Sequence, residues 1–345
     1  MEIQKIVCVI AIKFVLICTG YTQPLSNDLN KRISIKNIFT ELESYDPEDY
    51  DLFRASVFTF DAKTNQQYIY DYAQKNLFRI KFKDFNVTNV IAIGNGSGSG
   101  PGEFRNPTSM CIGNTEEGGK VVVIDSDLSR VTVWNVETGA LLSSFTTKKF
   151  APFRVACTES RIVLFNSLGS KKGDYLIVDY EGSEIESILD PQKNKNAFLD
   201  SGYLVANLNS VFNSSQGRPI LKKFHFDKKD PKSTIFIEPK IGENSIDRNK
   251  QGDYWIEKRD KDFIYQSRGI GLFDKYVVVL HSGRKDAYGN TLDFYDQESL
   301  EYQFSSEIDL YSQYMSISGN VLLVKGFDPN LDKSLFKFYE IHLPD

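Results

Sequence analysis

Hydrophobic and polar positions follow a pattern that returns along the whole chain. A run of three to five apolar residues precedes a polar turn, an alternating strand, a short turn rich in Asp, Asn or Gly, and a further strand. The clearest copy spans residues 121–145, where the apolar run Val121–Ile124 precedes the alternating segment Val131–Trp134. Self-similarity at such an interval is typical of repeat architectures. The pattern therefore predicts strands in repeated units and requires no long helix.

Six such units can be aligned along the chain. The segments that define the other five are 68–70 with 77–82, 162–165 with 175–178, 203–205 with 220–224, 276–280 with 291–295, and 321–324 with 335–339. A shorter strand and a tight turn come before the apolar run, as at Thr108–Gly113 before Val121. Each unit is thus expected to be a four-stranded antiparallel meander. Six meanders placed radially give an all-β, six-bladed β-propeller, which leaves only short strand edges unpaired.

The two ends of the chain together supply the four strands that the sixth unit needs. The sixth unit ends near His342 after three strands, whereas the alternating segment Arg32–Phe39 belongs to no unit. Pairing of this N-terminal strand with the sixth unit would close the ring, because an open ring exposes unpaired edges. We therefore predict a leader at residues 1–23, an N-terminal segment at 24–50 with the closing strand at 32–39, and the propeller at 51–345.

One stretch of the second unit carries a recognisable motif. Residues 93–107 read Ile-Gly-Asn-Gly-Ser-Gly-Ser-Gly-Pro-Gly-Glu-Phe-Arg-Asn-Pro, and Val122–Asp125 and Arg130–Val133 follow them. This order resembles the NHL repeat, and the resemblance implies that Asp125 and Arg130 pair across the strand turn. The whole chain, with its leader and Val277–Arg284, is similar to the TolB-like six-bladed propellers of Bacteroidota, which are often predicted lipoproteins. The resemblance implies a fold and an exported location more than an activity.

The first residues have the composition of an export leader. Lys5 supplies a positive charge, residues 6–12 and 14–17 are apolar, and the small residues Thr19 and Gly20 follow. The stretch is too short for an ordinary transmembrane helix. Val15–Cys18 resembles a bacterial lipobox, although Ile17 stands where that motif has Gly, Ala or Ser. Lipidation of Cys18, plain secretion and an uncleaved anchor therefore stay open, and the expected location is the periplasm, the membrane-anchored cell envelope or the exterior.

Charge and residue types exclude several classes of partner and cofactor. The net charge is −5, and it becomes −6 once the leader with Lys5, Lys13 and Glu2 is removed, so nucleic acid is not an expected partner. Cys111 and Cys157 then remain, and we expect two buried thiols, because a domain of this length needs no disulfide. No Cys-x-x-Cys pair exists and the three histidines have no ligand spacing, so no metal or other cofactor is predicted.

Two local features invite a functional interpretation. The glycine-rich loop at residues 94–102 has neither the Lys-Ser/Thr of a phosphate-binding loop nor a following helix, so we interpret it as a turn between units with Phe104 as a plug. His281 occupies the position that Asp125 holds in the second unit. A titrating imidazole there could serve binding or acid–base chemistry, and a hydrogen bond within the turn is the structural alternative.

In a meander, the long connections and the starts of the inner strands share one end, which we expect to be the recognition face. Arginines recur at these starts, and a funnel lined by them would attract a carboxylate, unless each pairs with a local acid such as Asp51 or Glu103. Tyr254 and Trp255 could form an aromatic platform or simply pack an insertion onto the ring. The candidate ligand-binding residues are Arg54, Arg105, Arg154, Arg268, His281, Arg284, Tyr254 and Trp255.

These features favour an exported, non-enzymatic binding or scaffold protein. Its partner is expected to be a peptide, a glycan or an envelope protein, and the chain is expected to be monomeric. A propeller-type lyase or hydrolase that acts in the central funnel is the alternative, although the sequence assembles no catalytic triad. A structural subunit of an envelope assembly is a third possibility.

Overall fold

The structure is a computed structural model in which residues 32–345 form one compact unit. It describes residues 32–343 except 148–149, 167–172, 192–196, 227–230, 238–245, 252–253, 260–261 and 285–287. For residues 197–198, 246–251, 254–259 and 284 only the backbone is described. The leader, with Cys18, lies outside the described residues. Within the described part, no helix is both long and apolar enough to span a bilayer.

Four sheets each consist of four consecutive antiparallel strands, which we number blades 1 to 4. Their strands are β2 (Ala55–Asp61), β3 (Gln66–Asp71), β4 (Asn76–Lys83) and β5 (Asn86–Ala92); β6 (Pro107–Thr115), β7 (Gly118–Asp125), β8 (Arg130–Asn135) and β9 (Leu141–Thr146); β10 (Arg154–Cys157), β11 (Ile162–Phe165), β12 (Tyr175–Val178) and β13 (Glu184–Ile188); and β14 (Gly202–Ala206), β15 (Ser210–Ser215), β16 (Ile220–His225) and β17 (Lys232–Ile235). The predicted all-β class and four-stranded meanders are confirmed.

A seven-stranded sheet contains two further meanders that share one long strand. In order along the chain its strands are β1 (Phe39–Tyr45), β20 (Tyr265–Phe273), β21 (Tyr276–Arg284), β22 (Gly289–Asp296), β23 (Tyr302–Ser318), β24 (Val321–Asp328) and β25 (Lys333–Ile341). The first half of β23 pairs with β22 and the second half with β24. We call β20 to the first half of β23 blade 5, and the second half of β23 with β24, β25 and β1 blade 6.

Three short elements complete the described chain. They are the 3-10 helix η1 (Pro47–Tyr50), the one-turn helix α1 (Ala197–Asp200), and a hairpin of β18 (Ile246–Gln251) and β19 (Tyr254–Arg259).

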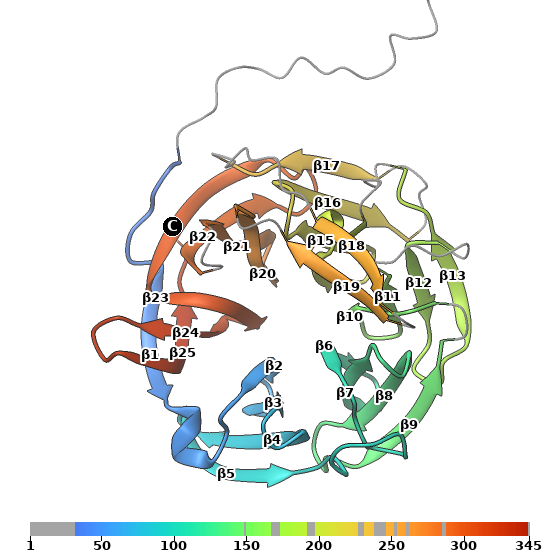
Figure 1. The fold of residues 1–345 in the computed structure, drawn as a ribbon. Coiled ribbons are helices and arrows are strands. Elements are labelled where there is room, and N and C mark those ends of the chain that lie inside the picture. The colour runs from blue at the N-terminus through green and yellow to red at the C-terminus, as the bar shows by residue number, and fades with distance from the viewer. Residues whose placement is uncertain are drawn as a thin grey trace, which may run out of the picture. The chain divides into compact units, whose positions relative to one another are not determined.

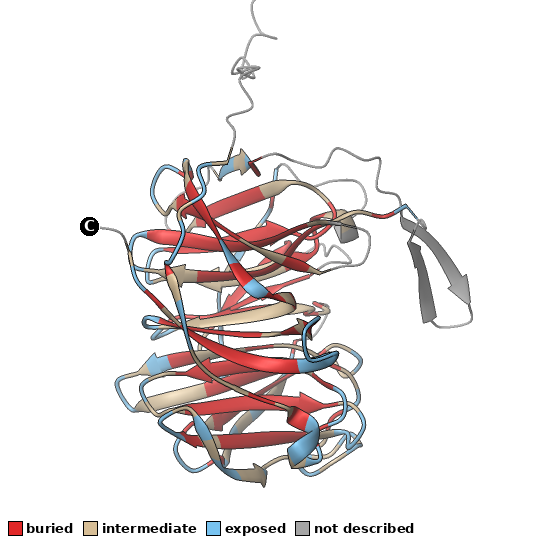
Figure 2. Ribbon diagram, turned by 90° about the vertical axis from the view of Figure 1, so that its left-hand side faces the viewer, coloured by how far each residue is buried: buried red, intermediate tan, exposed pale blue. Residues whose placement is uncertain are grey.

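The blades lie side by side around a central channel (Figure 1). The first strand of each blade is its inner strand, and each inner strand contacts the next in the order β2, β6, β10, β14, β20, β23 and back to β2. Buried residues follow the strands and exposed residues gather at the turns (Figure 2). The channel walls are therefore formed by strands from every blade.

Apolar clusters fill the spaces between neighbouring blades. Because successive side chains of a strand point to opposite faces of its sheet, one apolar run serves two clusters. In β7, Val121 and Val123 pack toward blade 1, whereas Val122 and Ile124 pack toward blade 3. This double burial explains why the second strands read as continuous apolar runs in the sequence.

The glycine-rich loop before β6 packs as a plug between blades 1 and 2. Phe104 is fully buried, and its ring lies against Tyr70 and Trp134. The guanidinium of Arg130 donates to the carbonyl oxygens of Ser99 and Gly100 at 2.9 Å, and Asp125 accepts from the backbone N–H of Arg105 at 2.6 Å. Asp125 and Arg130 are opposite each other across the β7–β8 turn, as the resemblance implies, and each side chain binds the backbone of the loop.

The N-terminal strand differs from its predicted bounds. β1 pairs with β25 from Phe39 onward, whereas upstream only Ser34 forms a bridge, parallel to Ser305 of β23. Asn37 has a φ of 62°, and this left-handed conformation interrupts the extended run between Arg32 and Phe39. The strand predicted at 32–39 is therefore wrong in its bounds, and the segment that pairs with blade 6 is Phe39–Tyr45.

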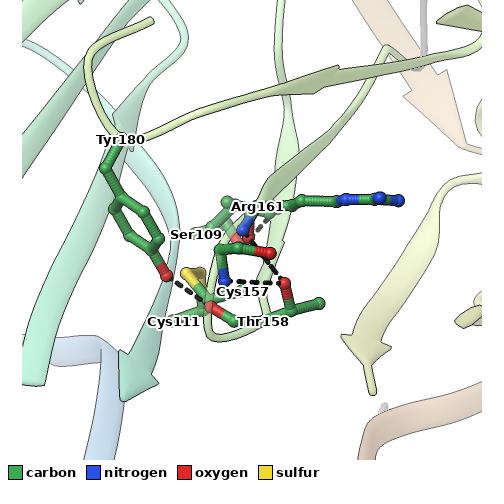
Figure 3. The surroundings of a disulfide bond; sticks show 8 residues. Ser109, Cys111, Cys157, Thr158, Arg161 and Tyr180 are labelled. Carbon is green, nitrogen blue, oxygen red and sulfur yellow. Dashed lines mark hydrogen bonds between the residues drawn. A yellow bond between two sulfur atoms is a disulfide. The ribbon is translucent and has the colours of Figure 1, made fainter. Parts of the chain in front are cut away.

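A disulfide joins Cys111 of β6 to Cys157 of β10 across the boundary of blades 2 and 3 (Figure 3). The two Cα atoms are 5.7 Å apart, within the usual range for a disulfide. Next to it, the hydroxyl of Tyr180 donates to the carbonyl oxygen of Thr158 at 2.6 Å. The expectation of two free thiols is wrong, because chain length says nothing about which inner strands lie side by side.

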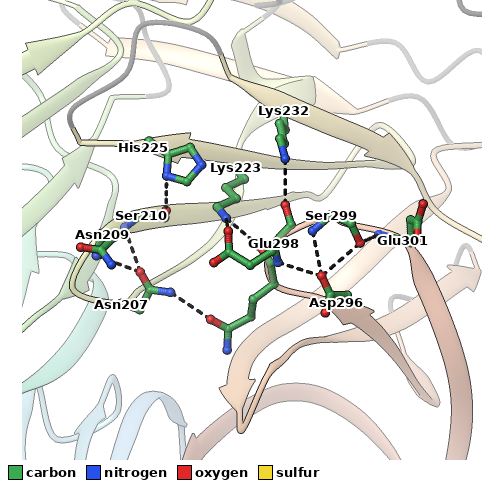
Figure 4. Close-up of polar contacts among 11 residues, drawn as sticks. Asn207, Asn209, Ser210, Lys223, His225, Lys232, Asp296, Glu298, Ser299 and Glu301 are labelled. Atoms are coloured by element: carbon green, nitrogen blue, oxygen red, sulfur yellow. Dashed lines mark hydrogen bonds and ion pairs between the residues drawn. The ribbon is translucent and has the colours of Figure 1, made fainter.

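Polar contacts also join blade 5 to blade 4 (Figure 4). The fully buried Lys223 of β16 binds Glu298 of the β22–β23 turn at 2.9 Å, and Asn207 donates to the side chain of Gln297 at the same distance. The hydrogen bond from Lys223 and its charge lower the pKa of Glu298. This turn is therefore held against the neighbouring blade by charge as well as by packing.

Candidate ligand-binding site

A cavity of about 270 Å³ lies in the channel at the end where the inner strands begin. We call it the arginine cavity, because Arg154 is the charged side chain in its lining. Its walls come from the first residues of β2, β6, β10 and β14, from Tyr314 and Met315 in the second half of β23, and from Ile270 of β20. The lining residues are Ser56, Val57, Phe58, Tyr72, Thr108, Ser109, Met110, Phe153, Arg154, Val155, Tyr203, Leu204, Ile270, Tyr314 and Met315.

A second cavity, of about 320 Å³, lies where the inner strands end. We call it the disulfide cavity, because Cys111 and Cys157 are in its lining. The two cavities share five apolar residues, which we call the apolar girdle: Phe58, Met110, Leu204, Ile270 and Met315. The channel is thus divided into two compartments of different chemistry.

Arg154 is the first residue of β10 and ties three blades together. Its Nε donates to the carbonyl oxygen of Gly202 in β14 at 2.6 Å, and its Nη1 donates to that of Thr108 in β6 at 2.7 Å. The guanidinium carbon lies 4.4 Å from the ring centroid of Phe153 and 5.2 Å from that of Tyr203. Burial lowers the pKa of Arg154, and the charge of Arg268 acts in the same direction.

Arg268 is a second cation, which lies behind the lining of the cavity and contacts its wall residue Tyr314. Only 5% of the residue is exposed, and its Nε has no hydrogen-bond partner. The guanidinium lies 5.1 Å from the ring centroid of Tyr265 and 5.3 Å from that of Tyr314. Burial opposes the charged form, but the surrounding phenol groups, Tyr203 and Tyr314 foremost, raise the pKa of Arg268. Arg268 is therefore a fully charged group in a poorly hydrated place.

Neither of these two guanidiniums pairs with a carboxylate among the described residues. Each is close enough to the other for its charge to matter. Two like charges in a buried site are unfavourable unless an anion or oriented dipoles compensate them. Backbone carbonyls and aromatic rings supply part of that compensation for Arg154, and the side chains of Tyr265 and Tyr314 supply part of it for Arg268. The arrangement is therefore suited to accept an anionic group.

The structure does not bring Arg54 and Arg105 into this cluster. Both side chains are exposed and neither lines the cavity. Their backbone N–H groups donate to the buried carboxylates of Asp71, at 2.8 Å, and of Asp125. These acids hold the chain at the start of an inner strand and leave the arginine side chains in solvent.

His281 lies inside blade 5 and not at the cavity. It is 5% exposed, its ring meets that of Phe236, and its Nδ1 is 3.7 Å from the carboxylate of Asp293. The same carboxylate forms an ion pair with Arg32 at 3.0 Å. The side chains of Arg284, Tyr254 and Trp255 lie outside those that the structure describes.

Sequence reasoning missed the aromatic part of the site. Tyr72, Phe153, Tyr203 and Tyr314 line the arginine cavity. A usable signal was present, because Phe153 and Tyr203 stand at strand starts equivalent to those used to select the arginines. The described residues contain no group of three or more His, Cys, Asp or Glu that could hold a metal ion.

Comparison with solved structures shows which fold the chain has. One similar structure is that of a protein of Bacteroides fragilis that is predicted to be exported, with 15% identity, a TM-score of 0.55, and coverage of 88% of this chain and 94% of that one. Another is the WD40 repeats of RRP9, with 8% identity, a TM-score of 0.51, and coverage of 90% and 99%. At such low identity the likeness shows the fold alone, and that fold is a β-propeller.

No protein-family model matches the sequence, and no curated protein matches it either. The likeness to the NHL repeat and to the TolB-like propellers therefore stays a prediction from residues 93–133 and from the periodicity.

Proposed function

We propose that this chain is an exported, non-catalytic binding propeller whose ligand places an anionic group between Arg154 and Arg268 in the arginine cavity. The observation that carries the proposal is a pair of neighbouring guanidiniums, partly buried Arg154 and buried Arg268, without a carboxylate partner in the described chain. Guanidinium groups form strong, oriented hydrogen bonds with carboxylates and other oxyanions. A peptide, a glycan or a partner protein that bears such a group would fit the loop-rich face.

Export is supported by three separate features. The sequence begins with a stretch that has the pattern of a leader. A disulfide between inner strands is typical of proteins that mature in an oxidising compartment. One structural neighbour is itself described as predicted to be exported. An acyl anchor at Cys18 would place the propeller at a membrane surface.

The proposal takes the ring to have six blades and β1 to fasten it. β1 supplies the outer strand of blade 6, and Lys337 of β25 binds Glu41 of β1 at 3.2 Å. The same ammonium group contacts Asp309 at 3.0 Å and Asp328 at 3.1 Å. These contacts support an N-terminal strand that joins the first and last parts of the ring.

Binding is favoured over catalysis by the composition of the cavity walls. The lining of the arginine cavity contains no His, Asp or Glu among the described residues. Hydrolases and lyases commonly use such groups as general acids and bases. The walls instead offer one guanidinium, five aromatic rings, hydroxyl groups and aliphatic side chains.

The test is a calorimetric titration of the purified protein with acetate, phosphate, glucuronate and hexanoate. At least one of these anions should bind, and Arg154→Ala and Arg268→Ala should each weaken its binding by about 1.5 to 3 kcal/mol, as expected for a charge-assisted hydrogen bond. Arg54→Ala and Arg105→Ala are matched controls, because both side chains are exposed and outside the cavity.

Two results would overturn the proposal. One is that no anion binds the wild-type protein. The other is that the control variants lose as much affinity for the anion as Arg268→Ala does. Such a result would mean that the arginines act only through long-range electrostatic attraction and not through contact with the anion. Melting temperatures of all four variants separate lost binding from lost folding.

A further inference from the structure

Several polar groups on the walls of the arginine cavity are engaged within the protein. Thr108 Oγ1 donates to the carbonyl oxygen of Phe153 at 3.0 Å, and the N–H of Val155 donates to Ser109 Oγ at 3.2 Å. Arg154 occupies the carbonyl oxygens of Thr108 and Gly202. The hydroxyl of Tyr72 donates to the carbonyl oxygen of Pro107. These bonds join β6, β10 and β14, and the remaining polar side chains of the lining are Ser56, Tyr203 and Tyr314.

The end of the cavity next to the apolar girdle offers apolar surface. Val57 and two residues of the apolar girdle, Leu204 and Met315, are only partly buried and line the cavity, and Phe58, Met110 and Ile270 complete the girdle. A hydroxylated ligand that reached the girdle would lose hydrogen bonds with water and gain none, which is costly. An alkyl or aromatic group there would gain from burial.

The hydrogen-bond donors of Arg268 indicate which anionic group the site would bind. Its guanidinium lies near the rings of Tyr265 and Tyr314, and its Nε carries an unused donor. A planar fork of this kind binds a carboxylate through two parallel hydrogen bonds. Arg154 has already committed its Nε and one Nη1 bond to backbone carbonyls, so Arg268 has more donors to offer.

The size of the cavity limits the ligand. Its volume of about 270 Å³ lies just under the range of roughly 300 to 1,000 Å³ that is usual for drug-sized ligands. A short chain or a single ring fits such a space, and a sugar chain does not.

We infer that the ligand is a carboxylate on a short apolar body, with the carboxylate on Arg268 and the body against the apolar girdle. This inference rests on the proposed function and narrows it to one class of ligand. The same chemistry has two sources, a free small carboxylate or the C-terminal residue of a peptide with an apolar side chain.

The experiment is a calorimetric titration with acetate, butyrate, hexanoate and octanoate. Each methylene group that reaches the girdle should raise affinity roughly fourfold until the cavity is full. Gluconate is the matched control for hexanoate, since it has the same carbon count and charge but a hydroxylated body, and it should bind at least about tenfold more weakly. Leu204→Asn and Met315→Gln should reduce the affinity for hexanoate and leave that for acetate unchanged.

A second titration, with a peptide, shows whether the carboxylate belongs to a free small molecule or to the C-terminal residue of a peptide. A tetrapeptide that ends in leucine is titrated as the free acid and as the C-terminal amide. Binding of the acid alone, lost in Arg268→Ala, assigns the site to chain ends; binding of hexanoate without the peptide acid assigns it to free carboxylates. Either result supports the carboxylate with an apolar body.

The failure of this inference is distinguishable from failure of the proposed function. Equal or tighter binding of gluconate, or affinity that does not change with chain length, overturns the inference. If Arg268→Ala still abolishes that binding, the anion site itself stands. If no anion binds at all, both fail. Since Met315→Gln could disturb the packing of β20 and β23, Leu204→Asn on β14 provides an independent variant.

Discussion

The two ends of the central channel are built from the same inner strands and have opposite chemistry. At the end where the strands begin, the guanidiniums of partly buried Arg154 and buried Arg268 lie among aromatic rings, and Nε of Arg268 has no hydrogen-bond partner. At the end where they finish, a disulfide joins β6 to β10. Hydroxyl groups there join β23 to β2, because Ser316 and Ser318 accept from the N–H groups of Phe60, at 3.2 Å, and Ala62, at 3.0 Å.

The difference between the two cavities suggests different roles, with the disulfide cavity contributing to stability and the arginine cavity to binding. In the disulfide cavity, covalent and hydrogen bonds hold neighbouring blades together and no cation is in the described lining. At the arginine cavity, two like charges lie close together without a carboxylate partner among the described residues, which is unfavourable for stability. Natural proteins commonly carry such unfavourable arrangements at their functional sites. Variants at the two ends should therefore affect different properties.

The largest expected effect is at the disulfide. A double variant Cys111→Ala, Cys157→Ala should lose about 4 kcal/mol of unfolding free energy, because the cross-link spans 46 residues and restricts the unfolded chain. Urea denaturation of the variant and of the wild type with and without reductant measures it. The folded variant should bind anions as the wild type does. A parallel loss of anion affinity in the folded variant would show that the two ends are not independent.

The next effect is a pH dependence at the arginine end. Lys325 donates to the carbonyl oxygen of Ala55 at the start of β2, and burial lowers the pKa of Lys325 to about 8. The pKa of lysine in an unfolded chain is about 10.4, so between pH 8 and 10 the unfolded state binds more protons. Stability should therefore rise by roughly 2 kcal/mol across that interval.

Urea unfolding at pH 7, 8, 9 and 10 tests this dependence. The rise should disappear in Lys325→Met and persist in Lys333→Met, because the side chain of Lys333 is mostly exposed. A wild-type curve that stays flat or falls from pH 8 to 9 would contradict the prediction.

Much of the fold could be predicted because each blade repeats one hydrophobic pattern. The run Val121–Ile124 is apolar at every position since both faces of its strand are buried, and the same is true of Val277–Leu280. Local pattern and packing agree in these strands, so the periodicity is a reliable guide. The predicted bounds of the N-terminal strand were wrong because Asn37 has a left-handed backbone conformation. The alternation of apolar and polar residues does not reveal such a conformation.

The candidate site was less predictable because it depends on where each arginine stands relative to the first residue of its strand. It also depends on which strands lie side by side, and these are distant in sequence. Arg54 and Arg105 precede β2 and β6 and point to solvent, whereas Arg154 is the first residue of β10 and Arg268 the fourth of β20. A shift of one or two residues thus decides between an exposed and a buried guanidinium. The disulfide likewise depends on the lateral contact of β6 with β10.

The smallest expected effect comes from removing one hydroxyl group at each end of the channel. Ser316→Ala removes the acceptor for the N–H of Phe60 at the disulfide end, and Ser109→Ala removes the acceptor for the N–H of Val155 in the arginine cavity. Each should cost about 1 kcal/mol of stability, the usual net value of one hydrogen bond. Only Ser109→Ala should also change the affinity for hexanoate, because Ser109 lines the arginine cavity. Paired urea unfolding and titration of both variants measure this, and an equal change of affinity in Ser316→Ala would mean that the girdle does not separate the two compartments.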